Sequence, residues 1–103
     1  MIIAVTRAGV ALRDADDLKK FAVSSELGSA DVAAILTETG WGRASDEEGH
    51  VAVSVAAVRN AAAAAGHASE EWDDGFERML AYAATKGWLV DPDHILAHVE
   101  GSE

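Results

Sequence analysis

The chain has 103 residues, of which 50% are hydrophobic and 25% charged, a length and composition that suit one globular domain and exclude wholesale disorder. Cysteine is absent, which excludes disulfides, thiolate chemistry and iron–sulfur clusters and leads us to expect a reducing, cytoplasmic location. The formal net charge of −10 would repel a phosphate backbone, so no nucleic-acid partner is expected.

Residues 1–103 are expected to form a single domain, because no internal repeat and no linker rich in Pro, Gly or Ser divides them. Residues 1–12 contain two apolar runs around Gly9, which fit a strand, a hairpin or a flexible arm. A short turn and then a strand at about residues 20–25 are predicted next. The N-terminal run has no basic leader, and no stretch approaches the roughly 20 apolar residues of a membrane span, so we expect no membrane association.

A capped helix followed by a hairpin is predicted for the next segment. The helix covers residues 30–39, with Ser29 as its N-cap and Gly40 as its stop. Two short extended runs, 41–44 and 50–53, flank a polar loop that ends in a glycine, which is typical of a hairpin with a long connection.

An alanine-rich helix is predicted over residues 55–65, with Ser54 as its N-cap and Gly66 as its stop. Alanine favours helix but contributes little apolar area to a core. A core with so few bulky side chains favours self-association, because a homo-oligomer buries more surface.

The clearest local signals lie between Ser69 and Val99, where two capped helices are predicted. Ser69 precedes glutamates that the positive end of a helix dipole favours, and Gly87 ends this helix. Its apolar face is expected to carry large side chains at helical spacing: Trp72, Phe76, Met79 and Leu80.

The segment after Gly87 is expected to carry Trp88-Leu89-Val90 across the core. Asp91 and Pro92 then fit the N-cap and first position of a last helix, whose apolar stripe is Ile95, Leu96 and Val99. Together these elements predict an α+β fold in which a small antiparallel sheet of short strands packs with four to five helices.

Metal and cofactor patterns are weak. His94 and His98 are four residues apart on the predicted last helix, a spacing that points two imidazoles the same way, but no third ligand stands out. They are weak candidates, and no metal site is predicted. Residues 40–43 match only the opening of a dinucleotide-binding fingerprint and follow a helix instead of a strand, and no phosphate-binding loop is present, so no cofactor is predicted.

Five residues make up the candidate ligand-binding set: Trp72, Phe76, Tyr82, Trp88 and His50. The rings could line an apolar pocket, with Tyr82 or His50 as its polar anchor. In a domain this small such rings more often form the core. A third interpretation places one tryptophan at a protein interface.

The leading functional hypothesis is a non-catalytic accessory or protein-interaction domain that self-associates. It rests on the broken or missing nucleophile, cofactor and metal patterns, while the acidic charge adds a basic protein as a further candidate partner. The alternative is a small-molecule-binding protein or small enzyme with a tryptophan-lined pocket.

Overall fold

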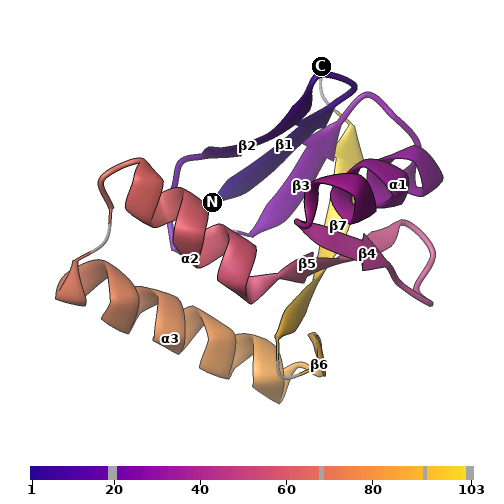
Figure 1. Cartoon of the computed structure of the whole chain (residues 1–103). Helices are drawn as coiled ribbons and strands as arrows, with labels where there is room; N and C mark the ends of the chain where they lie inside the picture. Colours follow the sequence, from indigo (N-terminus) through magenta and orange to yellow (C-terminus); the bar gives the residue numbers. More distant parts are fainter. Residues whose placement is uncertain (19–20, 68, 92, 102–103) are drawn as a thin grey trace.

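A computed structural model describes residues 1–18, 21–67, 69–91 and 93–101 (Figure 1). Three strands come first, and the remaining strands are interspersed with the helices. In chain order the elements are β1 (Ile2–Thr6), β2 (Gly9–Arg13), β3 (Ala22–Ser25), α1 (Ser29–Thr39), β4 (Gly42–Ala44), β5 (His50–Ser54), α2 (Val55–Ala64), α3 (Glu70–Thr85), β6 (Leu89–Asp91) and β7 (His94–Gly101). Within the described part of the chain, every helix is too short or too polar to span a membrane.

The strands form one mixed sheet in the order β2-β1-β3-β7-β5-β4, with β6 pairing to β7 off this path. Strand β3 runs parallel to both of its neighbours, β1 and β7, while the remaining pairs are antiparallel. The α+β class is confirmed, but the predicted small antiparallel sheet with four to five helices is wrong. The described residues form a 7-stranded mixed sheet and three helices.

The last predicted helix accounts for most of this error. Its residues form β7, which pairs with β3, β5 and β6 and so links the two halves of the sheet. Ile95, Ala97 and Val99 alternate into the core, with the two-residue period of a strand. The run is short enough that a helical stripe fitted it equally well. Pro92, the predicted first residue of that helix, lies outside the described residues.

Most of the shorter-range predictions are confirmed. Residues 2–13 form the β1–β2 hairpin, and the hairpin expected from residue 41 is β4–β5. The Ser54 hydroxyl accepts the N–H of Ala57 at 3.2 Å and so caps α2. Ser29 is not the N-cap of α1, because the helix already includes it and Gly28 occupies the cap position without a side-chain hydrogen bond.

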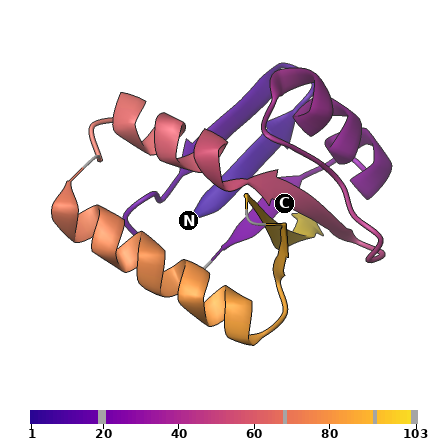
Figure 2. The same ribbon diagram turned by 60° about the horizontal axis from the view of Figure 1, so that its bottom comes forward.

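A hydrophobic core forms between the strands and the three helices. Its fully buried side chains come from both kinds of element, as in Ile3, Val5, Val23, Leu36, Val51, Val53, Val58 and Phe76. Helices α2 and α3 lie side by side (Figures 1 and 2). Arg59 of α2 joins them, because it pairs with Glu77, lies 3.6 Å from Asp73 and places its guanidinium 4.8 Å from the centre of the Phe76 ring.

Candidate functional site

The aromatic residues of the candidate set separate into a buried pair and an exposed pair. Trp72 and Phe76, in the first half of α3, are 6% and 0% exposed, and their rings stack with centroids 4.9 Å apart. The Trp72 indole N–H donates to the carbonyl oxygen of Ala15 at 2.7 Å, which satisfies the one polar group of this ring inside the protein. These two rings fill the core.

One edge of Trp72 does reach a shallow hollow of about 320 Å³ at the start of α3. Asp16, His67 and Glu71 are among the other residues around it. The ring offers very little surface to a ligand there, because 94% of Trp72 is covered by the rest of the chain, as its 6% exposure shows. The hollow is therefore a polar surface depression and not a tryptophan-lined pocket.

Tyr82 and Trp88 lie at the opposite end of α3 and form the exposed pair. Their exposed fractions are 57% and 43%, and Val90, two residues beyond Trp88, is 38% exposed. The two rings meet edge to face with centroids 5.9 Å apart. We call Tyr82, Trp88 and Val90 the Trp88 surface. Exposed large apolar side chains that gather in this way commonly mark an interaction site.

The end of α3 fixes where Trp88 lies. Gly87 adopts a φ of +76°, its N–H donates to Ala84 O at 3.2 Å, and the N–H of Trp88 donates to Ala83 O at 2.9 Å. These bonds make a Schellman motif, which ends a helix with a left-handed residue and brings the next side chain back onto the last turn. The contact of Trp88 with Tyr82 follows from this geometry. The backbone therefore holds the two rings together without burying them.

A hydrogen bond to the sheet holds the segment that follows α3 and carries Trp88 and Val90. The N–H of Leu96 in β7 donates to Trp88 O at 2.6 Å. Leu89 is half-buried and packs on the core, so its neighbours Trp88 and Val90 point outward, as alternation along an extended segment requires. The prediction that residues 88–90 cross the core therefore holds only for Leu89.

A groove of about 410 Å³ adjoins the Trp88 surface. Its apolar lining residues include Val90, Leu96 and Ala52, and the loop between β4 and β5 contributes Ser45, Asp46 and Glu47. The residues lining it are Arg43, Ala44, Ser45, Asp46, Glu47, Ala52, Gly87, Val90 and Leu96. Val90 belongs both to this groove and to the Trp88 surface, so the two form one continuous area.

His50 and the two C-terminal histidines lie on neighbouring strands. His50 of β5 is the register partner of His98 in β7, with ring centroids 5.1 Å apart. Because β7 is a strand, His94 and His98 lie about 13 Å apart along it, too far for both to hold one ion. Among the described residues no group of three or more His, Cys, Asp or Glu is placed to hold a metal. His50 belongs to neither aromatic pair.

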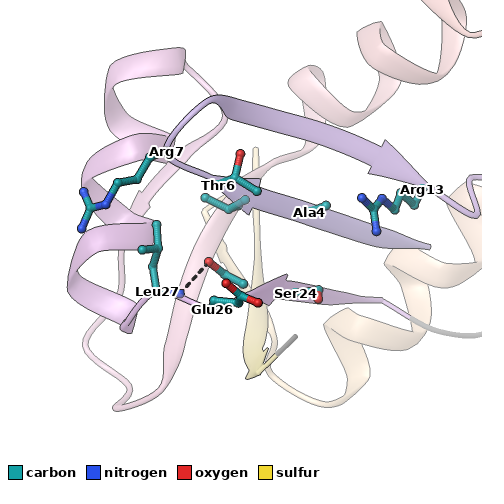
Figure 3. A pocket seen from close by; sticks show the side chains of 9 residues that line it. Ala4, Thr6, Arg7, Arg13, Ser24, Glu26 and Leu27 are labelled. Atoms are coloured by element: carbon teal, nitrogen blue, oxygen red, sulfur yellow. Dashed lines mark hydrogen bonds between the residues drawn. The ribbon is translucent and has the colours of Figure 1, made fainter. Parts of the chain in front are cut away.

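A second hollow, of about 420 Å³, opens beside β1 and β3 (Figure 3). Ala4 and Ser24, partners in the parallel register, line it with small side chains. Arg7 and Arg13 lie at its opposite ends, and Glu26 lines it as well. The polar groups thus carry both signs of charge and do not converge on one point, which a small-molecule site would require.

The groove could not be identified from local sequence patterns. Val90, Leu96, Asp46 and Glu47 lie outside the predicted site set, and they meet only because β5, β6 and β7 pair. The one local signal was the acidic run at residues 46–48, which alone indicates only a solvated loop. No protein-family model, no curated protein and no solved structure matches the chain.

Proposed function

We propose that this protein is a non-catalytic protein-interaction domain that binds its partner through the Trp88 surface. The observation that carries the proposal is the exposure of Tyr82, Trp88 and Val90 together at the end of α3. Tryptophan and tyrosine supply much of the binding energy at protein interfaces, because they bury large areas with little loss of side-chain freedom. The Schellman motif also holds the backbone of Trp88 in place before a partner binds, which lowers the entropy lost on binding.

The small-molecule alternative receives less support. Trp72 and Phe76 fill the core, while the hollow beside β1 and β3 carries no aromatic side chain. The groove beside Trp88 is open, and its lining includes two carboxylates and an arginine. Such a shape suits an extended segment of a protein more than an enclosed metabolite.

Affinity capture followed by measurement on the purified partner tests the proposal. Proteins held by the wild-type chain would be identified, purified and titrated calorimetrically against both the wild-type chain and Trp88→Ala. We expect Trp88→Ala to weaken binding at least about tenfold, as removal of a central interface tryptophan does. Arg13→Ala is the matched control, because Arg13 is exposed and lines the other hollow, and it should bind within about twofold of wild type. Equal affinity of the Trp88→Ala and wild-type chains would contradict the proposal.

We also propose a cytoplasmic location, which the absence of cysteine supports. Self-association stays a prediction, and the alanine-rich composition supports it. Light scattering over the micromolar range measures it directly. A constant monomer mass across that range would remove self-association from the proposal and leave the partner-binding role standing.

A further inference from the structure

We infer that the partner's binding segment is basic as well as apolar, and that it lies along the groove between Val90 and the β4–β5 loop. This inference rests on the proposed function, since it assigns the chemistry of the segment that the Trp88 surface receives. The groove itself supplies the reason. Val90 and Leu96 line it together with two acidic residues of the loop, Asp46 and Glu47.

The carboxylates are available to a partner. Asp46, Glu47 and Glu48 are all exposed, and no ion pair within the described residues involves the side chain of Asp46 or Glu47. The backbone around them is held in place, because the Ser45 hydroxyl donates to His50 O at 2.7 Å across the loop. The loop that carries the carboxylates therefore has a defined backbone path beside the groove.

Two cations border the same area and limit where the partner's positive charge can lie. Arg43 lines the groove, and Lys86 places its ammonium 5.5 Å from the centre of the Tyr82 ring. The basic side chains of the segment should therefore point toward Asp46 and Glu47, while its apolar side chain contacts Trp88 and Val90. This arrangement specifies an orientation as well as a composition.

Charge also argues against a second copy of the chain as the occupant. Each copy carries a formal net charge of −10, so two copies approaching through the acidic loop would repel one another. A basic segment is attracted by the same field, which raises its rate of association. If the wild-type chain formed a dimer that Trp88→Ala converts to a monomer, the basic-partner inference would be overturned in favour of self-association.

Peptide display provides an unbiased test. Random peptides of about 12 residues, long enough to span such a groove, would be selected on the full chain and counter-selected on Trp88→Ala. We expect the surviving peptides to carry net positive charge together with a large apolar side chain. Survivors that are neutral or acidic would overturn the inference and leave the proposed function intact. Failure to recover any Trp88-dependent peptide would count against the proposed function itself.

Neutralising Asp46 and Glu47 then tests whether the basic side chains of the peptide bind at this loop. A synthetic peptide from the selection should bind Asp46→Asn/Glu47→Gln about three- to tenfold more weakly, and about 0.3 M salt should reduce its affinity for wild type in the same way. The matched control, Glu70→Gln/Glu71→Gln, removes the same charge at the start of α3. That helix has 16 residues and so spans about 24 Å, which places the control pair far from Trp88. Equal weakening by both double variants would show attraction to overall charge and would overturn the inference.

Discussion

The two aromatic pairs of α3 make the same kind of contact in opposite surroundings. Trp72 and Phe76 stack at 4.9 Å, and Tyr82 and Trp88 meet edge to face at 5.9 Å. Around the first pair, Arg59 of α2 lies over the Phe76 ring and Ala15 accepts the Trp72 indole N–H. The second pair lies where the chain leaves the helix, and both of its rings stay more than 40% exposed.

This difference shows that ring contact alone does not distinguish a core from a binding surface. Both pairs gain from the attraction between aromatic rings, but the first pair gains far more from being removed from water. Substitutions in the first pair should therefore change the free energy of unfolding, and substitutions in the second should change mainly the affinity for a partner.

Replacing Phe76 by alanine should have the largest effect on folding. The ring is fully buried and lies beneath Arg59, so its loss leaves a cavity and should lower the free energy of unfolding by about 3–5 kcal/mol. Urea denaturation followed by circular dichroism measures this change. A loss below about 1 kcal/mol would mean that Phe76 is not part of the closed core.

Replacing Trp72 by phenylalanine tests the buried hydrogen bond. The smaller ring keeps most of the apolar contact but leaves the Ala15 carbonyl without its indole donor, which should lower the free energy of unfolding by about 1–3 kcal/mol. Denaturation of this variant beside wild type gives the value. Unchanged stability would show that the bond between α3 and the turn after β2 contributes nothing.

Gly87→Ala tests the Schellman motif that positions Trp88 at the end of α3. An alanine at a φ of +76° is strained, so we expect a loss of about 1–2 kcal/mol in the free energy of unfolding and a displaced Trp88 ring. Near-ultraviolet circular dichroism reports the change in ring environment. Gly87→Asn is a suitable comparison, because asparagine adopts the left-handed conformation more readily than alanine and should lose less stability.

Tyr82→Ala should change folding least, although it removes an aromatic ring from the same helix as Phe76→Ala. The side chain is 57% exposed and alanine is the better helix former, so the free energy of unfolding should change by less than about 1 kcal/mol. Denaturation and partner titration on one sample separate the two effects. A stability loss as large as that of Phe76→Ala would erase the distinction between the pairs.

The extent to which the sequence predicts this protein depends on how local each feature is. Ser69 accepts the N–H of Trp72 at 3.1 Å and caps α3 as predicted, because a cap depends only on the residues beside it. The strand β7 could not be separated from a helix, because its pairing partners in β3 and β5 lie far away in the sequence. Tertiary pairing overrode local propensity there.

The candidate site likewise combines features that local sequence predicts with features that depend on strand pairing. Tyr82 and Trp88 were predicted as site residues from their aromatic character, while their exposure depends on how β6 joins β7. The groove residues Leu96 and Asp46 come together only when the sheet closes. Nothing in the local sequence around either residue indicates that meeting.

The indole N–H signals of the three tryptophans in a proton–nitrogen correlation spectrum test the central claim most directly. The selected basic peptide would be titrated into the labelled chain, and each signal would be assigned by substituting its tryptophan. The account predicts a saturable shift of the Trp88 signal while the Trp72 signal, hydrogen-bonded within the core, stays in place. An unmoved Trp88 signal, or an equal shift of the Trp72 signal, would contradict the division between a closed core pair and an open binding pair.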